Sequence, residues 1–350
     1  MKQDKELAMN MLSKKSSTIM FFACCMILIY LLGQGTIEIS YGKTCRILLN
    51  IFQGKMTNTD LLEDIVYYLR LARFVLAMLI GAGLAVAGCV MQAVMRNPLA
   101  DPYLLGISSG AGLGAVIAII LGFTNVMGFD SVGFFAFIGA LAVTVCIIFI
   151  AYAFGSSNTT TILLSGMAFN AVSAACINLL ISVYADTERI QSVTFWLMGS
   201  LQNAKWENIS ILAVVVVALV VYFYKNSRIL NLMLFGDEAA ITLGYNLAHI
   251  RMLYISLCAV MVGLIVYNSG IIGFIGLVVP HIVRLVYGGN YKQILLGSAL
   301  AGAVFMVMAD VISRVTVEGS EAPIGIVVSV IGAPVFVYLL LSRNYGYNKK

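Results

Sequence analysis

Long apolar runs separated by short polar segments recur along almost the whole chain. A helix needs about 20 mainly apolar residues to cross the hydrocarbon core of a membrane. The candidate spans are residues 18–36, 66–92, 103–122, 131–154, 161–184, 208–224, 250–268, 271–287, 294–314 and 323–341. Because 61% of the 350 residues are apolar and 11% are charged, the chain is too apolar for a soluble domain. The sequence predicts an all-α polytopic membrane protein with about ten transmembrane helices, in one transmembrane domain over residues 1–350.

The distribution of Lys and Arg predicts the orientation of these spans. Placing both termini in the cytoplasm puts most of the 21 Lys and Arg residues there, as the positive-inside rule expects. No small-x-small cleavage site follows the first run, so we expect an uncleaved first helix after a cytoplasmic tail of residues 1–17. We therefore expect a multi-pass membrane protein with both termini in the cytoplasm. The net charge of +5 is interpreted as topology, and nothing indicates nucleic-acid binding.

Two of the expected spans are short and broken. Residues 102–110 follow the Asn97-Pro98 turn, and residues 270–281 contain three glycines before a proline. They occupy corresponding places if the chain consists of two five-helix halves. An odd number of helices per half makes the halves opposite in orientation, which is an arrangement common among transporters. The sequence thus favours transport and two inverted five-helix halves.

All five prolines are expected at structural breaks. We expect Pro98 and Pro102 to shape the turn into the third helix, and Pro280 to interrupt the eighth. Pro323 and Pro334 are expected to bound the last helix. These prolines are structural candidates, and none is expected to contact a substrate.

The longest polar segment on the predicted cytoplasmic side covers residues 225–251. Asp237 begins a short run that stops at Gly244, and Asn246 begins a second run that ends at Arg251. Both runs have helix punctuation, because an acidic residue or Asn suits a helix start and glycine a helix end. We interpret them as two short helices that form a docking surface for another protein. A well-capped loop is the alternative.

Several motifs resemble one known family. They are residues 69–73 (LRLAR), 88–92 (GCVMQ), 96–102 (RNPLADP), 105–111 (LGISSGA), 196–201 (WLMGSL), 236–240 (GDEAA), 243–244 (LG), 273–284 (GFIGLVVPHIVR), 309–310 (AD), 321–325 (EAPIG) and 332–336 (GAPVF). In this order they resemble the FecCD type of ABC importer permeases, which serve iron-siderophore, haem and cobalamin uptake. The resemblance covers about residues 65–341. It implies the type II importer permease fold.

The same resemblance implies partners and a substrate. A second permease subunit, as homodimer or related heterodimer, a cytoplasmic ABC ATPase dimer and an extracytoplasmic substrate-binding protein are expected, with membrane lipid around the spans. The chain itself would be no enzyme and would need no cofactor, since the partner hydrolyses ATP. An iron-siderophore is the favoured cargo, with haem or cobalamin as alternatives. Residues that match the family's ATPase-coupling segment are Gly236, Asp237, Glu238, Ala239, Ala240, Leu243 and Gly244.

Three arginines match family positions that receive acidic residues of the binding protein: Arg70, Arg73 and Arg314. Charged pairs of this kind speed encounter and fix register. The alternatives are that these residues reach lipid headgroups, or that Arg314 pairs with Asp310 one helical turn earlier. Ala72 stands where the family usually has proline, which puts the relative geometry of the first two arginines in doubt. An outer loop of residues 185–207, for which the family implies a short helix, would lie on the same side.

Asn158, Thr159 and Thr160 resemble the family's polar cytoplasmic gate, in which short side chains close the path between two subunits. An ordinary helix cap is the alternative.

An ion-coupled secondary transporter is the alternative of another class. Such a protein needs charged groups within its spans, and the expected helix interiors carry almost none. No catalytic residues and no metal site are predicted, because the two histidines, His249 and His281, lie in different segments and the seven cysteines show no ligand spacing.

Overall fold

The computed structural model describes residues 39–55, 60–123, 125–126, 129–153, 159–316 and 320–341. The cytoplasmic tail and the first expected span, residues 18–36, lie outside these residues. Within them the regular elements are helices, apart from two-residue strands β1 (Asn125–Val126) and β2 (Phe129–Asp130), which pair antiparallel.

The described helices are α2 (Tyr41–Phe52), α3 (Leu61–Asp64), η1 (Ile65–Leu71), α4 (Ala72–Val94), η2 (Pro102–Leu105), α5 (Ile107–Leu121), α6 (Ser131–Ala153), α7 (Thr159–Tyr184), α8 (Thr187–Met198), α9 (Trp206–Lys225), α10 (Ser227–Phe235), α11 (Asp237–Thr242), α12 (Leu247–Ser269), α13 (Ile275–Tyr287), α14 (Tyr291–Val315) and α15 (Ile324–Leu341). Each expected span from the second to the tenth corresponds to a described helix, in order, and α2, α8, α10 and α11 lie between the spans. Six helical segments of the described chain are long and apolar enough to cross a membrane, and α5, α13 and α15 are shorter apolar helices. The all-α, multi-span fold class is confirmed.

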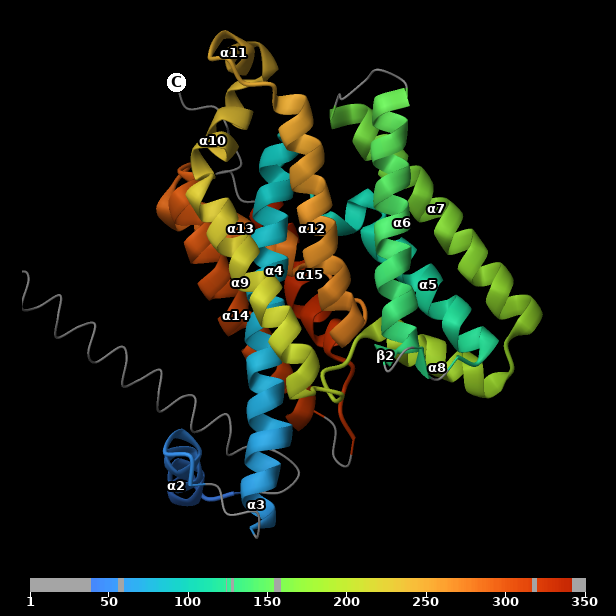
Figure 1. The fold of residues 1–350 in the computed structure, drawn as a ribbon, viewed down its shortest axis with the longest axis vertical. Helices are drawn as coiled ribbons and strands as arrows, with labels where there is room; N and C mark the ends of the chain where they lie inside the picture. Colours follow the sequence, from blue (N-terminus) through green and yellow to red (C-terminus); the bar gives the residue numbers. More distant parts are fainter. Residues whose placement is uncertain are drawn as a thin grey trace, which may run out of the picture.

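Helix α4 lies at the centre of the bundle, where it packs against α9, α12, α13 and α14 (Figure 1). Small residues permit this close packing. A Cβ atom added to Gly81 would lie 2.1 Å from the carbonyl oxygen of Gly302, and one added to Gly88 would lie 1.8 Å from that of Gly276. Larger residues at these glycines would therefore push α4 away from α14 and α13.

Helices from the two halves of the chain pack in a reciprocal way. Helix α4 packs along α14, and α12, which has the corresponding place in the second half, packs along α6. Figure 1 shows α4 starting near α3 at the lower end, whereas α12 starts near α11 at the upper end. The two corresponding helices thus run in opposite directions, as expected for two inverted halves.

The turn between α4 and α5 has the predicted break. The side chain of Asn97 accepts a hydrogen bond from the N–H of Leu99 at 2.9 Å, beside Pro98. Asp101 caps η2 by accepting from the N–H of Tyr103 at 3.2 Å, and Pro102 occupies the first turn of η2. Pro98 and Pro102 therefore form the expected turn into the short α5.

Two proline predictions are wrong. Helix α13 continues through Pro280, and the chain breaks earlier, between Gly270 and Phe274, where both residues have positive φ. Helix α15 begins directly after Pro323, as predicted, but it also runs through Pro334 to Leu341. Proline thus does not end a helix whose carbonyls can be satisfied by neighbouring protein.

Gln92 of α4 supplies such a neighbour at Pro280. Proline lacks the N–H that would reach the carbonyl four residues earlier, which belongs to Gly276. The Nε2 atom of Gln92 donates to that carbonyl oxygen and to the one of Leu277, each at 3.4 Å. Its Oε1 atom accepts from Arg284 at 3.2 Å. One amide therefore joins α4 to both ends of the proline-containing turn of α13.

Candidate functional site

The predicted coupling segment forms the upper end of the bundle in Figure 1. Asp237 begins α11, as predicted, and Gly236 and Gly244, at its two ends, have φ of 105° and 80°. The second short helix was predicted wrongly: residues 247–251 are the first turn of α12, because no break separates them from the apolar run that follows. Asn246 still caps this start by accepting from the N–H of Ala248.

Asp237 joins α11 to two other parts of the chain. Its Oδ1 atom accepts from an Nη2 atom of Arg96 and, at 2.9 Å, from Nη2 of Arg251. Arg96 lies two residues after the end of α4 in the left-handed conformation, with φ of 49°, and Arg251 is a fully buried residue of α12. These ion pairs therefore link α11 directly to the α4–η2 turn and to α12.

The tip of the segment is apolar and exposed. Phe235, Ile241 and Leu243 expose 77%, 68% and 64% of their surface, and the adjacent Glu238 is also exposed. Ala240 faces inward and is buried. Large apolar side chains clustered at one exposed end are typical of a protein-binding surface.

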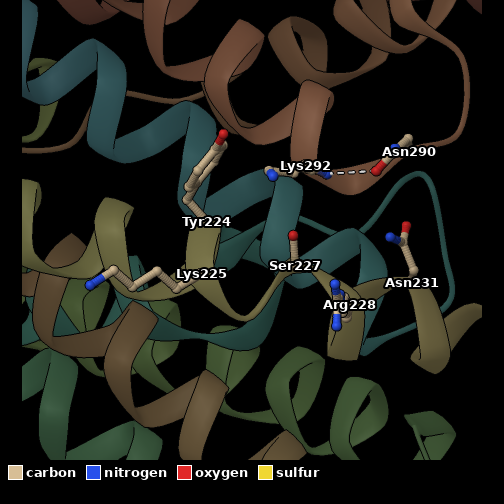
Figure 2. A pocket seen from close by; sticks show the side chains of 7 residues that line it. All are labelled: Tyr224, Lys225, Ser227, Arg228, Asn231, Asn290 and Lys292. Carbon is tan, nitrogen blue, oxygen red and sulfur yellow. Dashed lines mark hydrogen bonds between the residues drawn. The ribbon is translucent and has the colours of Figure 1, made fainter.

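A basic pocket lies close to this end. Helices α9, α10 and the start of α14 enclose a cavity of about 460 Å³, and its cationic residues are Lys225, Arg228 and Lys292 (Figure 2). The remaining side chains drawn around it are polar or aromatic.

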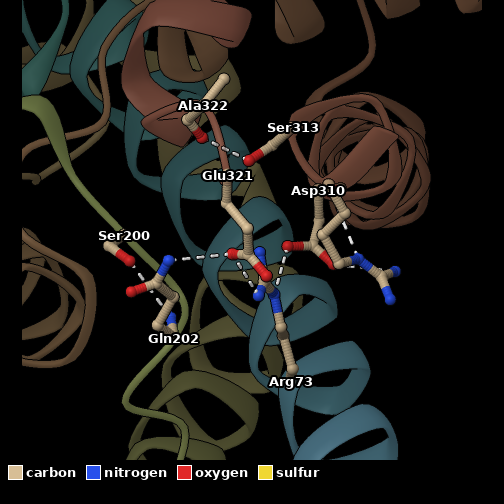
Figure 3. A network of polar contacts seen from close by, with 8 residues as sticks. Arg73, Ser200, Gln202, Asp310, Ser313, Glu321 and Ala322 are labelled. Atoms are coloured by element: carbon tan, nitrogen blue, oxygen red, sulfur yellow. Dashed lines mark hydrogen bonds and ion pairs between the residues drawn. The ribbon is translucent and has the colours of Figure 1, made fainter. Parts of the chain in front are cut away.

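An ion network forms at the opposite end, which also holds α2, α3 and α8. Arg73 of α4 donates from Nε to Asp310 of α14 at 2.6 Å and from Nη1 to Glu321 at 2.7 Å (Figure 3). Glu321, just before α15, also accepts from Gln202 at 3.1 Å. Arg314 reaches the other carboxylate oxygen of Asp310 at 3.2 Å. The network ties α4, α14, the start of α15 and the loop after α8 together.

The three predicted docking arginines lie near one another but are not displayed as exposed cations. Arg70 and Arg73 are buried, and Arg314 is half-buried against Asp310, which is the pairing considered as its alternative. The π-helix η1, which contains Arg70, continues directly into α4 at Ala72. Without a proline at this position the helix runs unbroken from Leu61 to Val94.

The remaining predicted residues lie apart from these two ends or outside the described chain. Thr159 and Thr160 form the first turn of α7, and Asn158 lies outside the described residues. His249 and His281 lie on different helices, and no group of three possible metal ligands occurs in the described part of the chain. The predicted loop of residues 185–207 contains α8, in agreement with the expected short helix.

Sequence reasoning did not find four residues that connect the two ends to the bundle. Arg96, Arg251, Gln92 and Glu321 all contact residues distant in sequence. Arg96, Gln92 and Glu321 fall within the motifs that resemble the family. Membership of these motifs was the only feature of the sequence that could have singled them out.

Comparisons with known proteins agree with this arrangement. The model of the FecCD transport family matches residues 21–342. The hemin transport system permease protein HmuU of Yersinia pestis is 37% identical over 290 residues, 82% of this chain and 86% of that protein. The cobalamin import system permease protein BtuC of Halobacterium salinarum is 40% identical over 282 residues, 81% of this chain and 74% of that protein.

A solved structure is similar along almost its whole length. It is described as a metal-chelate type ABC transporter in an inward-facing conformation, with a TM-score of 0.79, 28% identity, and coverage of 93% of this chain and 99% of that one. The fold and these likenesses define an ABC importer permease, which is a transport subunit and not itself an enzyme. The chain belongs to the FecCD transport family.

Proposed function

We propose that this permease moves a metal chelate into the cytoplasm, with an iron-siderophore as the first candidate, and that a separate ABC ATPase dimer drives it from the α11 end. The observation that carries the ATPase assignment is the exposed apolar tip of Phe235, Ile241 and Leu243, at the segment that matches the family's coupling motif. Family membership supports an ATPase partner in general.

Asp237 supports a mechanical role for this segment. Its ion pairs to Arg96 and Arg251 connect α11 to the α4–η2 turn and to α12. When the ATPase closes and displaces α11, these contacts would carry the displacement into helices next to the short, broken α5. Gly236 and Gly244, with φ of 105° and 80°, would let the chain turn sharply on either side of α11, and Ala239 and Ala240 belong to the same family-like motif within the helix.

We further propose that a substrate-binding protein docks at the opposite end, on the cytoplasm-distal side. Arg70, Arg73 and Arg314 are gathered there, which supports docking by acidic residues. Because Arg73 and Arg314 already pair with Asp310, a docking carboxylate would have to share or replace an internal one. The membrane would be a bacterial inner membrane, and both termini would lie on its cytoplasmic side.

A second permease subunit would complete the path. Helix α7 supports this proposal, because it packs mainly on α5 and leaves Leu164, Met167 and Leu179 exposed along its length. Thr159 and Thr160 begin this helix, so a polar gate between subunits, including Asn158, belongs to the same proposal.

The relatives favour a second candidate substrate. The two named permeases carry hemin and cobalamin, which are tetrapyrrole chelates, whereas the similar solved structure is named only for metal chelates. Haem or cobalamin is therefore the alternative cargo. Measuring which of a ferric siderophore, hemin or cobalamin shifts the melting temperature of the cognate binding protein decides between them.

The ATPase assignment is tested with a triple variant, Asp237→Ala/Glu238→Ala/Leu243→Asp, in liposomes with the cognate ATPase. We expect normal insertion, loss of ATPase stimulation and no chelate uptake. Leu49→Asp, which alters an exposed apolar residue of α2 at the other end, is the matched control and is expected to keep both activities. Full ATPase stimulation in the triple variant would remove α11 from the ATPase interface.

A further inference from the structure

The pocket between α9, α10 and α14 concentrates positive charge. Lys225 ends α9, Arg228 lies in the first turn of α10 and Lys292 in the first turn of α14. All three side chains are exposed, and no acidic residue is among the described residues that line the cavity. The ammonium of Lys292 is held 5.4 Å from the ring centre of Tyr224, over the wall of the pocket. Three uncompensated cations around one cavity fit an anionic ligand.

The neutral groups of the pocket are oriented as donors. The Oδ1 atom of Asn231 accepts from the backbone N–H of Tyr291 at 3.0 Å. The Oδ1 atom of Asn290 accepts from the backbone N–H of Lys292 at 3.0 Å (Figure 2). Since each carbonyl oxygen is used in this way, the Nδ2 group of each amide is left to donate. Cations and amide donors together match the oxygens of a phosphate group.

Exposed apolar stripes lead away from two of the cations. On α9, Val217, Val221 and Lys225 follow one another at a spacing of four residues, so they share one face of the helix. The two valines expose 55% and 44% of their surface.

Helix α14 repeats the pattern in the opposite direction. Lys292, Leu296 and Leu300 also share one face, and the two leucines expose 51% and 63%. Helices α9 and α14 contact each other, and both are long and apolar enough to cross a membrane. The pocket therefore lies where two exposed apolar stripes end.

We propose that this pocket binds the phosphodiester headgroup of an anionic phospholipid, whose acyl chains lie along the stripes of α9 and α14. Soluble anions and acidic protein segments share the charge of this ligand but would leave the stripes unused. Bound lipid would brace the junction from which α10 extends to α11. The assignment of this lipid to the cytoplasmic leaflet of the membrane rests on the proposed function. The lipid binding itself does not rest on it.

The test compares lipid binding by purified full-length protein and a matched pair of variants. Phosphatidylglycerol is titrated into detergent-solubilised protein and counted by native mass spectrometry, with phosphatidylcholine of the same chains and inorganic phosphate as separate arms. The pocket variant is Lys225→Gln/Arg228→Gln/Lys292→Gln. The control, Lys43→Gln/Arg46→Gln/Lys205→Gln, removes three exposed cations from the opposite end.

We expect phosphatidylglycerol to bind roughly 100-fold more weakly to the pocket variant, because each cation near an anionic lipid contributes about fivefold to affinity. The control should stay within about twofold of the unchanged protein, and Lys292→Gln alone should lose about fivefold. The single variant keeps the proposal testable if the triple variant does not fold.

Three results would overturn the proposal: equal losses in the pocket and control variants, equal binding of phosphatidylglycerol and phosphatidylcholine, or full displacement of the lipid by millimolar phosphate. Unchanged lipid binding by the pocket variant would also overturn it, because the three cations would then not hold the lipid. The assay contains neither ATPase nor chelate, so its outcome is independent of the transport assignment.

Discussion

At the α3 end of the bundle Arg73 lies buried between Asp310 and Glu321, whereas at the α11 end Asp237 lies half exposed between Arg96 and Arg251. The first network joins helices that form the bundle. The second joins the bundle to a short helix that projects from it and carries exposed apolar residues. Similar ion pairs thus join the helices of the bundle at one end and attach a short, exposed helix to the bundle at the other.

The difference in burial has an energetic consequence. Removing one partner of a buried ion pair leaves a charge without solvent and costs about 3–5 kcal/mol, whereas an exposed pair contributes about 0–1 kcal/mol. We therefore expect the α3 end to determine stability and the α11 end to determine activity.

The largest expected effect on stability comes from Arg73→Leu. It removes a contact to each of two carboxylates, so we expect a loss of about 3–5 kcal/mol in the free energy of unfolding. Arg96→Leu is the matched change at the other end and should cost about 1 kcal/mol or less. Thermal unfolding of both variants in detergent measures the difference, and equal losses would abolish the distinction between the ends.

A smaller effect is expected at the α4–α13 contact that lies between the ends. Gln92→Leu removes the donor to the carbonyl of Gly276, and an unsatisfied buried carbonyl costs about 1–3 kcal/mol. Pro280→Ala restores an N–H that can reach the same carbonyl within α13. The double variant should therefore be more stable than the sum of the single losses predicts. Strictly additive losses in a double-mutant cycle would show that Gln92 does not compensate for the proline.

The remaining effect depends on pH and concerns Asp101, a buried carboxylate that forms no ion pair with any described residue. Burial raises the pKa of Asp101 to about 7, against the lowering effect of the hydrogen bond from Tyr103. The folded state thus holds a proton that the unfolded state releases, so stability falls as pH rises from about 4 to 7.

Asp101→Asn keeps an oxygen to cap η2 and removes the titration. We expect the variant and the unchanged protein to have the same melting temperature near pH 4. At pH 8 the variant should melt a few degrees higher than the unchanged protein. A melting difference that does not vary with pH would mean that Asp101 is not held neutral by burial.

The sequence predicted the spans well because crossing a membrane imposes a length and composition that can be counted. It also located Asp237 at the start of α11 from helix-capping chemistry. It missed α10, whose nine residues lie in the polar segment 225–251 with no helix predicted for them, and it separated residues 247–251 from α12. Capping residues show where a helix can start. They do not show whether the apolar residues that follow belong to the same helix.

Long-range contacts could not be predicted in the same way. The pairing of Arg314 with Asp310 was foreseen as an alternative because the two residues are one turn apart. Arg73 and Asp310 are 237 positions apart, and Arg96 and Asp237 are 141 apart, so only packing brings them together. The helical path through Pro280 likewise depends on Gln92, which no local pattern reveals.

The central claim is that Asp237 transmits movement from the ATPase into the bundle while the apolar tip binds the ATPase. The most direct measurement is the amount of chelate imported per ATP hydrolysed in liposomes containing Asp237→Ala, with Glu238→Ala as the neighbouring control. We expect Asp237→Ala to retain at least about half of the ATP hydrolysis while import per ATP falls about tenfold or more, the scale of one lost charged hydrogen bond. An unchanged ratio in Asp237→Ala, or the same fall in Glu238→Ala, would contradict the claim.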